Sequence, residues 1–213
     1  GGNLGMAIIR EHLAAMGLGL HNDLQNEHSI VGNNIGLLLM LEYGTPEQQA
    51  EWLPGLKSAT RGFALGITEP DHGSDATHME TTAVRDGDEW IINGSKTWNT
   101  GIHKAKHDLI FARTSGKAGD GDGITAFLTP TDSEGFKVEE MLWTFNMPTD
   151  HGRVSMKDVR VPHEAIFGGE GRGLGVVQHF FNENRIRQAA SSLGAAQFCI
   201  NESIAYALSL IHI

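Results

Sequence analysis

The sequence predicts an α+β fold in which helices come first, a run of β-strands follows and a long helix closes the chain. Three observations support this prediction. Apolar residues recur at helical spacing up to about residue 62, short β-prone runs separated by turns fill residues 63–166, and helical spacing returns from Gly171. We therefore expect a partial N-terminal helical domain at 1–62, a middle β domain at 63–166 and the first helix of a helical bundle at 167–213.

The N-terminal part contains three predicted helices. The stretch MAIIREHLAAMG has apolar residues at helical spacing and a stop at Gly17, and GNNIGLLLMLEYG is a second helix closed by Gly44. In TPEQQAEWLPGL, Thr45 is suited to the N-cap and Pro46 to the first helical position, with acidic residues in the first turn. We expect Pro54 to end this third helix.

The middle part predicts a meander of short strands. TTAVRDGDEWIINGSKTWNT predicts strands joined by an Asp86-Gly87 turn and an Asn93-Gly94 turn. HDLIFARTS and GITAFLTP predict two further strands, and GFKVEEMLWTF and GRVSMKDVRVP continue the pattern. Several short strands with regular turns are typical of an antiparallel barrel or sandwich.

The last part predicts one long helix with an apolar seam of the kind found in bundles. The seam residues fall on alternating three- and four-residue steps, with Gln197 at the one polar position: Ile186, Ala190, Leu193, Ile200, Ile204 and Ala207. We expect Cys199, in the same stretch, to be a small core residue. As the only cysteine it cannot form an intrachain disulfide, which fits a reducing compartment.

Composition excludes some classes of function. The net charge of −10 argues against nonspecific nucleic-acid binding, which needs a positive face. No stretch resembles a signal peptide, and the longest apolar run, Ile35 to Leu41, is too short for a membrane span. The chain lacks an initiator Met at position 1 and stops within the helical pattern of ALSLIHI, so we expect a fragment. Whether residues 209–213 are native is left open.

The stretch ITEPDHGSDATH is the first candidate site. An apolar strand ends at Ile67 and Thr68, and a proline then fixes the turn. Gly73 and Ser74 offer backbone N–H groups with little steric cover, an arrangement that favours anionic oxygens such as phosphates. The alternative is a plain connecting loop with solvated aspartates.

The stretch NGSKTWNTG is the second candidate. Trp98 stands beside Asn99 and Thr100 near a strand end, and a tryptophan among hydrogen-bonding residues can be a platform for a flat aromatic ring. The alternative is that Trp98 is an ordinary core aromatic.

The third candidate lies in QHFFNENRIRQAASSLG. Asn182 and Arg185 are three residues apart and share one helix face. An arginine near a core edge could bind an anion or a carbonyl oxygen, or it could form a salt bridge to a neighbouring helix.

Metal and dinucleotide motifs are weak. His103 and His107 have a chelating spacing only if they are helical, and no cysteine or carboxylate cluster supports them. GEGRGLG lacks the G-x-G-x-x-G spacing of a Rossmann motif, and GDGDG lacks the later glutamate of a calcium loop. We therefore predict no metal site.

The three stretches, in this order, resemble the acyl-CoA dehydrogenase family. ITEPDHGSD is similar to the family's T-E-P-x-x-G-S-D segment, and NGSKTWNTG to its N-G-x-K-x-W-x-T segment. VRVPHEAIFGGEGRGLGVVQHFFNENR resembles the passage that leads to the family's arginine helix. The resemblance covers residues 28–208. It implies an N-terminal helical domain, a middle β domain and a C-terminal four-helix bundle, of which this chain would hold only the opening helix.

The resemblance implies FAD as cofactor, an acyl-CoA thioester as substrate and α,β-dehydrogenation as the reaction. The implied cofactor-binding residues are Ile67, Thr68, Gly73, Ser74, Trp98, Asn99 and Thr100. The implied substrate-binding residues are Ser74, Asn182 and Arg185.

The sequence departs from the family pattern at several points. Asp71 and His72 replace small residues, and Asn99 is more polar than the usual residue. The catalytic base of most members is a glutamate that would lie beyond residue 213. Some members place it directly before the helix arginine, but Asn184 there cannot act as a base, and Glu183 is not assigned.

Other implications follow from the resemblance alone. Electrons would pass to an electron-transfer flavoprotein, and the protein would be a homodimer or homotetramer in the bacterial cytoplasm or the mitochondrial matrix. A flavin oxidase or monooxygenase on the same fold, and a scaffold module without catalysis, stay open as alternatives.

Overall fold

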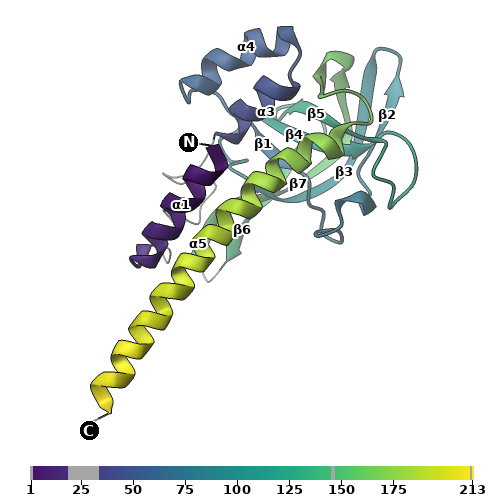
Figure 1. Cartoon of the computed structure of the whole chain (residues 1–213). Helices are drawn as coiled ribbons and strands as arrows, with labels where there is room; N and C mark the ends of the chain where they lie inside the picture. Colours follow the sequence, from purple (N-terminus) through teal and green to yellow (C-terminus); the bar gives the residue numbers. More distant parts are fainter. Residues whose placement is uncertain (1, 19–33, 145–146, 212) are drawn as a thin grey trace. The chain divides into compact units, whose positions relative to one another are not determined.

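A computed structural model describes residues 2–18, 34–144, 147–211 and 213. It confirms the α+β class with helices, a β-sheet and a long closing helix (Figure 1). The chain forms two compact units, one of residues 35–178 and one of residues 1–34 with 179–213. Residues 19–33 of the predicted N-terminal helical domain lie outside the described residues, and the boundaries predicted at 62 and 166 stay predictions.

Two helices open the larger unit: α3 (Ile35–Tyr43) and α4 (Pro46–Lys57). The predicted cap at Thr45 is confirmed as a capping box, in which the side chains of Thr45 and Gln48 each accept a hydrogen bond from the other residue's backbone N–H. The expected stop at Pro54 is wrong, because the helix continues past it. Its last turn buries Leu56 on the same face as Trp52, and this burial offsets the cost of an internal proline.

The strands of this unit form one eight-stranded sheet in the order β6-β7-β3-β2-β4-β5-β8, with β1 paired to β4. Their bounds are β1 Ala64–Gly66, β2 Thr82–Asp86, β3 Glu89–Thr100, β4 His107–Arg113, β5 Ile124–Pro130, β6 Phe136–Thr144, β7 Met147–Pro162 and β8 Ile166–Phe167. Short 3₁₀ turns lie at Ala76–His78 and His163–Ala165. Most pairings are antiparallel, as predicted, but β4 runs parallel to both β1 and β2. The β2–β3 hairpin reverses the chain and β4 then resumes the direction of β2.

β3 runs unbroken from Glu89 to Thr100, so the predicted turn at Asn93-Gly94 is wrong. Its pairing with β7 shifts register between Ile92 and Gly94, which marks a bulge. Gly94 has φ +149°, and a Cβ there would lie 2.4 Å from the Thr81 hydroxyl oxygen. The glycine therefore permits a bulge and a close approach within a strand, where the sequence indicated a hairpin.

The sheet carries the main core of this unit. Its buried cluster includes residues from β2, β3, β4, β5 and β7: Ala83, Trp90, Ile92, Ile110, Ala112, Phe127, Met156, Val159 and Val161. α4 is tied to the β8 segment because the Gln48 amide donates to the carbonyl oxygens of Glu164 and Ile166.

The smaller unit contains α1 (Gly2–Ala15) and the part of α5 (Gly173–Leu210) from His179 onward. The two helices approach closely at Gly194, where a Cβ would lie 2.1 Å from the carbonyl oxygen of Glu11. Arg10 is fully buried, and its Nε donates to the Ser191 hydroxyl at 2.8 Å. A small residue and a polar contact thus define the packing of this helix pair.

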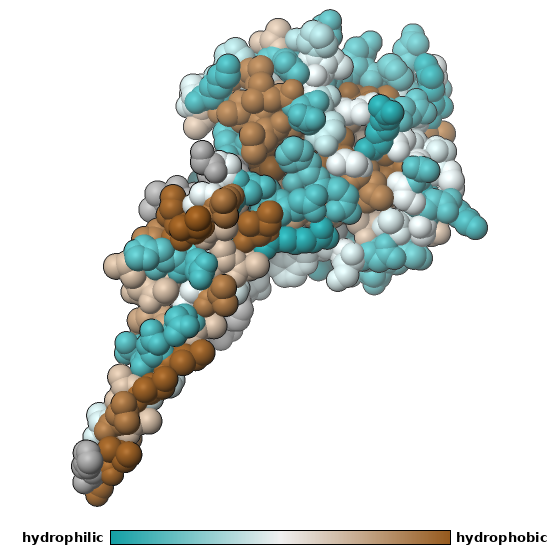
Figure 2. All heavy atoms as spheres, in the orientation of Figure 1, coloured by the Kyte–Doolittle hydropathy of each residue, from teal (hydrophilic) through white to brown (hydrophobic). Residues whose placement is uncertain are grey.

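The predicted apolar seam of α5 is largely exposed. Leu193, Ile200 and Ile204 face solvent, and apolar side chains run along the C-terminal part of the helix (Figure 2). Cys199 is also exposed, so its prediction as a core residue is wrong. Within the described ranges, no helix is both long and apolar enough to cross a membrane.

Candidate functional site

Hydrogen bonds to the backbone join two of the candidate stretches. The Thr97 N–H donates to the Thr68 carbonyl oxygen at 2.8 Å, and the Lys96 ammonium donates to the Ile67 carbonyl oxygen at 3.1 Å. We call Ile67, Thr68, Lys96, Thr97 and Trp98 the β1–β3 junction. The structure therefore brings together the two segments that the sequence singled out separately.

Trp98 has an unusual conformation at this junction. Its φ is +67°, and the pairing of β3 with β7 shifts register between Lys96 and Asn99. A left-handed conformation costs a bulky residue about 1–3 kcal/mol, so the surrounding structure must hold it in place. The residue as a whole is 47% exposed. Trp98 is thus an available aromatic face, whereas the alternative of an ordinary core aromatic would require burial.

His151 lies beside the exposed ring of Trp98. It pairs with Thr100 across β3 and β7, and its Nδ1 lies 3.0 Å from the Thr100 hydroxyl oxygen. Its ring packs edge-on to Trp98, with centroids 6.2 Å apart. No local sequence pattern marks His151, because only the register of β7 on β3 brings it to this position.

A buried ion pair lies directly behind the junction. Lys96 is 0% exposed, and its ammonium donates to Glu69 Oε1 at 2.8 Å. The Glu69 carboxylate also accepts the backbone N–H groups of Glu80 and Thr81. Burial lowers the pKa of Lys96 to about 8, although the charge of Glu69 opposes this. Burial acts to raise the pKa of Glu69, but the charge and hydrogen bonds around it lower that pKa below its ordinary value.

A second buried pair involves Asn99, which the sequence assigned to the cofactor. Asn99 is fully buried, and its Nδ2 donates to Asp108 Oδ2. Its side chain therefore supports β3 from within and is not presented on the exposed face of Trp98. Burial raises the pKa of Asp108 to about 7, against the hydrogen bond from Asn99 and the charge of Lys96.

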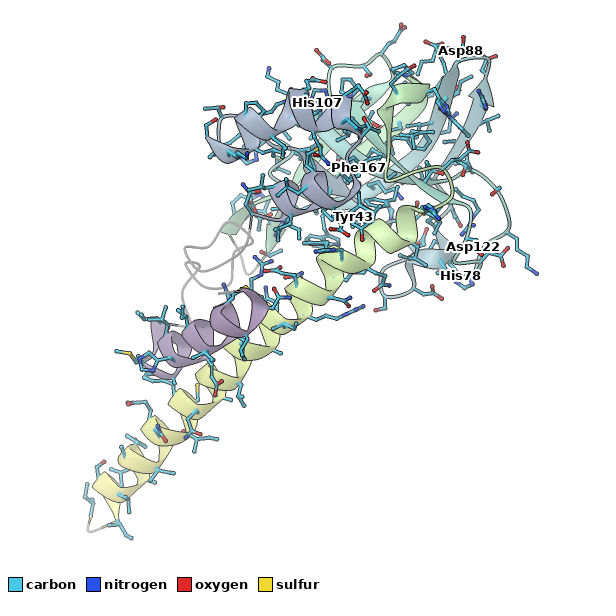
Figure 3. The ribbon with its side chains drawn as sticks, turned by 45° about the horizontal axis from the view of Figure 1, so that its top comes forward. Tyr43, His78, Asp88, His107, Asp122 and Phe167 are labelled. Atoms are coloured by element: carbon cyan, nitrogen blue, oxygen red, sulfur yellow. The ribbon has the colours of Figure 1, made fainter. Side chains whose placement is uncertain are left out.

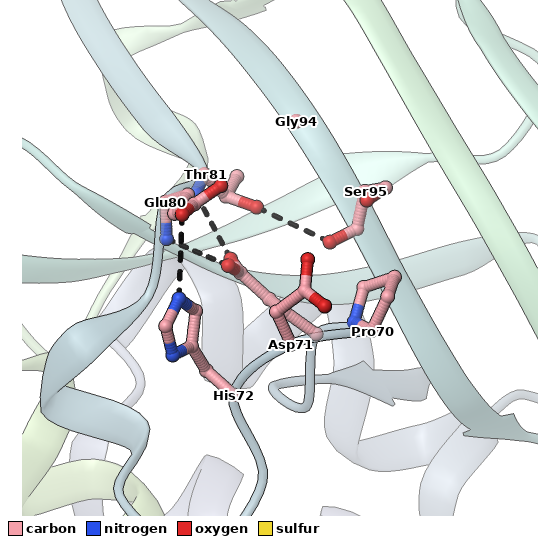
Figure 4. Close-up of a pocket in the computed structure, with 8 residues that line it drawn as sticks. Pro70, Asp71, His72, Glu80, Thr81, Gly94 and Ser95 are labelled. Atoms are coloured by element: carbon pink, nitrogen blue, oxygen red, sulfur yellow. Dashed lines mark hydrogen bonds and ion pairs between the residues drawn. The ribbon is translucent and has the colours of Figure 1, made fainter.

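The loop after β1 borders a small polar hollow of about 190 Å³ (Figure 4). Asp71 and His72, the departures from the family pattern, both line it, and His72 Nε2 lies 3.4 Å from Glu80 Oε1. Gly73 and Ser74 follow on the exposed part of the loop, and a Cβ at Gly73 would meet no atom within 4 Å. A side chain at Gly73 would thus meet open space, and the binding of anionic oxygens by Gly73 and Ser74 stays a prediction.

A larger hollow of about 550 Å³ lies at the start of α5. Its lining includes Tyr43, Asp122, Arg172 and Gln178, and Figure 3 shows where Tyr43 and Asp122 lie. None of the predicted site residues lines it. Arg172 belongs to the GEGRGLG stretch, whose glycine spacing does not fit a Rossmann motif.

Asn182 and Arg185 lie in the smaller unit, on the exposed surface of α5. Arg185 Nη1 donates to Asn182 Oδ1 at 3.4 Å, and its guanidinium lies 5.4 Å from the centre of the Phe181 ring. Their shared helix face is therefore as predicted.

The histidine pair considered for a metal has no helical spacing. His107 lies in strand β4, and its ring packs edge-on against Trp52 at 4.8 Å, while His103 lies in the preceding turn. Among the described residues, no group of three or more His, Cys, Asp or Glu side chains is arranged to hold a metal ion.

Comparison with known proteins matches both parts of the chain. Residues 64–159 match the family model "Acyl-CoA dehydrogenase, middle domain", and residues 171–210 match "Acyl-CoA dehydrogenase, C-terminal domain". The chain is 32% identical over 209 residues to acyl-CoA dehydrogenase fadE12 of Mycobacterium tuberculosis, which covers 97% of the chain and 52% of that protein.

Two further relatives agree with this match. The chain is 37% identical over 170 residues to glutaryl-CoA dehydrogenase of Desulfococcus multivorans, covering 78% of the chain and 43% of that protein. The solved structure of a glutaryl-coenzyme A dehydrogenase with glutaryl-CoA superimposes with a TM-score of 0.74 at 32% identity, covering 97% of the chain and 52% of that structure. The chain thus spans about half the length of the relatives it matches.

Proposed function

The chain belongs to the acyl-CoA dehydrogenase family, and from this premise we propose that the protein binds FAD and dehydrogenates an acyl-CoA thioester between its α and β carbons. The observation that carries the proposal is the hydrogen bond from Thr97 to Thr68, because it brings a hydroxyl residue and the exposed Trp98 ring to one site. Among the relatives, the glutaryl-CoA complex supports a thioester substrate.

The residues present fit a flavin. Trp98 offers an exposed aromatic face held by a strained backbone, whereas Ile67 at the strand end is buried at 7% exposure. The Thr68 hydroxyl has no hydrogen-bond partner among the described residues, so it is available to a ligand. Thr100 offers a hydroxyl whose direction is set by His151. When bound, FAD would accept the hydride from the substrate.

The other residues would bind and orient. We propose that Thr68 donates to polar atoms of the flavin ring and that Gly73 and Ser74 approach phosphate and the CoA moiety through open backbone N–H groups. Asn99 would act from behind the ring by supporting β3. Asn182 and Arg185 would line the CoA channel.

The proton of the α carbon needs a base, which we propose lies outside residues 1–213. Glu183 does not suit this role, because it is 3% exposed and its Oε2 lies 3.9 Å from Nε of Arg187. Electron transfer to a flavoprotein partner and assembly into a homo-oligomer are part of the same proposal. The exposed apolar residues of α5 would suit contacts with other helices.

The first prediction concerns FAD itself. The full-length protein, mixed with FAD and desalted, should keep a flavin absorbance band. Trp98→Ala and Thr68→Val should each weaken FAD binding about two- to tenfold, the effect of losing one aromatic contact or one hydrogen bond. Trp143→Ala is the matched control, since Trp143 is 68% exposed and lies on β6. No retained flavin, or equal losses in Trp98→Ala and Trp143→Ala, would contradict the proposed site.

The second prediction concerns Arg185. Arg185→Ala in the full-length protein should weaken acyl-CoA binding by about 1.5–3 kcal/mol, the value of a charge-assisted hydrogen bond, with FAD retained. Calorimetric titration with a non-reactive acyl-CoA analogue measures this. Arg160→Ala, which removes a guanidinium from an exposed ion pair with Asp86 and Glu89, should leave the affinity unchanged. Equal affinity in the two variants would remove Arg185 from the substrate site.

A further inference from the structure

Asp108 is an acidic side chain at the centre of the sheet. It is 0% exposed, and β4 places it between Ala64 of β1 and Thr129 of β5. Neither of these partner positions carries a charge. A carboxyl group in this position would be costly as an anion unless hydrogen bonds and a counter-charge compensate it.

The hydrogen bonds around Asp108 do not compensate a full negative charge. Asn99 Nδ2 donates to Asp108 Oδ2, but Oδ1 of Asp108 and Oδ1 of Asn99 have no partner among the described residues. Both of these buried atoms are acceptors when the carboxyl is ionised. A protonated carboxyl supplies one O–H donor and removes one charge, so the neutral acid suits this surrounding better.

The nearby charges point the same way. β3 contributes Lys96, whose ammonium donates to the Ile67 carbonyl and to the Glu69 carboxylate. One ammonium between two carboxylates leaves a net negative charge in the interior if both acids are ionised. His107, the preceding residue, instead packs against Trp52. The resulting pKa of Asp108, raised by burial to about 7, agrees with this geometry.

Asp108 also lies beside residues that adjoin the β1–β3 junction on both strands, Gly66 on β1 and Asn99 on β3. A Cβ at Gly66 would lie 2.9 Å from Asn99 Nδ2 and 3.3 Å from Asp108 Oδ1. The buried pair thus lies against the last residue of β1, directly before Ile67. Asn99 itself stands between Trp98 and Thr100. A change in the Asp108–Asn99 contact should therefore shift the two strand segments that form the β1–β3 junction.

We propose that Asp108 is a pH-sensitive positioning residue. As a neutral acid it holds the β1–β3 junction in the conformation that exposes Trp98, and when it loses its proton the junction loosens. Only the claim that the β1–β3 junction binds a flavin rests on the proposed function. The proton equilibrium and its effect on Trp98 are properties of this chain alone.

The deciding experiment follows Trp98 fluorescence without cofactor. The emission of the Trp98→Phe variant is subtracted from that of the parent protein at each pH, so that the other tryptophans cancel. All proteins in this comparison carry His151→Gln, because the ionisable ring of His151 packs edge-on against Trp98. We expect one transition centred near pH 7, the value to which burial raises the pKa of Asp108. The transition should disappear in Asp108→Asn. If that variant does not fold, Asp108→Ser is used in its place, and the transition should disappear there too. Asp88→Asn should retain it, because Asp88 lies on an exposed turn between β2 and β3 (Figure 3).

Infrared spectroscopy supplies the direct test. The carbonyl band of a protonated carboxylic acid should fade through the same pH range and be missing in Asp108→Asn. A flat Trp98 signal in the parent protein, or an unchanged transition in Asp108→Asn, overturns the inference.

FAD titration separates the inference from the proposed function. If the parent protein binds FAD, its affinity should fall several-fold from pH 6 to pH 8 and stay constant in Asp108→Asn. An equal fall in both proteins overturns the inference. Failure of the parent protein to bind FAD at any pH overturns the proposed function, while the Trp98 signal still decides the role of Asp108.

Discussion

Replacing Lys96 by methionine should lower the free energy of unfolding by about 3–5 kcal/mol, as is found when one partner of a buried ion pair is removed. Methionine fills a similar volume but leaves the buried Glu69 carboxylate without its counter-charge. It also removes the donor to the Ile67 carbonyl oxygen at the end of β1. Urea denaturation at pH 7, followed by circular dichroism, measures the loss.

The surface pair Lys137–Glu139 is the matched control. Its ammonium and carboxylate also form a short contact, but Lys137 is largely exposed. Lys137→Met should therefore change the free energy of unfolding by less than about 1 kcal/mol. Equal effects of the two substitutions would show that the Lys96 pair does not behave as a buried one.

The partner substitution should cost less. Glu69→Gln keeps one oxygen, which can accept the N–H group of either Glu80 or Thr81, since these two groups bind different oxygens of the carboxylate. Asp108 stays as a second acid that can ionise and balance the charge of Lys96. The double variant Lys96→Met with Glu69→Gln should recover part of the loss of Lys96→Met, because no uncompensated charge is left on Glu69. A loss in the double variant equal to the sum of the single losses would contradict this coupling.

Much of the fold could be predicted because its signals are local. Each of three signals comes from residues that are only a few positions apart. They are the capping box at Thr45, the helical spacing in α5 and the alternation of short strands and turns. The errors arose where tertiary contacts outweigh local preference. Asn93-Gly94 is a strong hairpin signal, yet β7 pairs along both sides of it and turns the glycine into a bulge.

The candidate site shows the same division. Thr68 and Trp98 could be identified because each stands in a contiguous motif, although their contact depends on a hydrogen bond between segments far apart in the sequence. His151 and Asp108 carry no motif. His151 reaches Thr100 only through the register of β7 on β3, and Asp108 meets Asn99 only because Gly66 leaves room between them. These contacts require the folded sheet.

Stability should depend on pH through Asp108 in a direction opposite to that of most acidic residues. The pKa of its carboxyl rises from 3.8 to about 7 on burial, so the folded state binds a proton more tightly than the unfolded state. Below pH 4 both states are protonated and the stabilising effect is fully present. As the pH rises from about 4 to 7, only the unfolded state ionises, and stability falls by at most about 4 kcal/mol in total.

Asp108→Asn should abolish this dependence, because an amide keeps the shape and the hydrogen bond but does not ionise. Urea midpoints of the two proteins should nearly coincide at pH 4 and diverge as the pH rises, with Asp108→Asn the more stable at pH 8. Asp88→Asn should follow the parent protein throughout. Parallel curves for the parent protein and Asp108→Asn would mean that Asp108 ionises in the folded protein as easily as in the unfolded chain. Lys96 would then have to be shared between two buried carboxylates, and Glu69→Gln should in that case stabilise the fold.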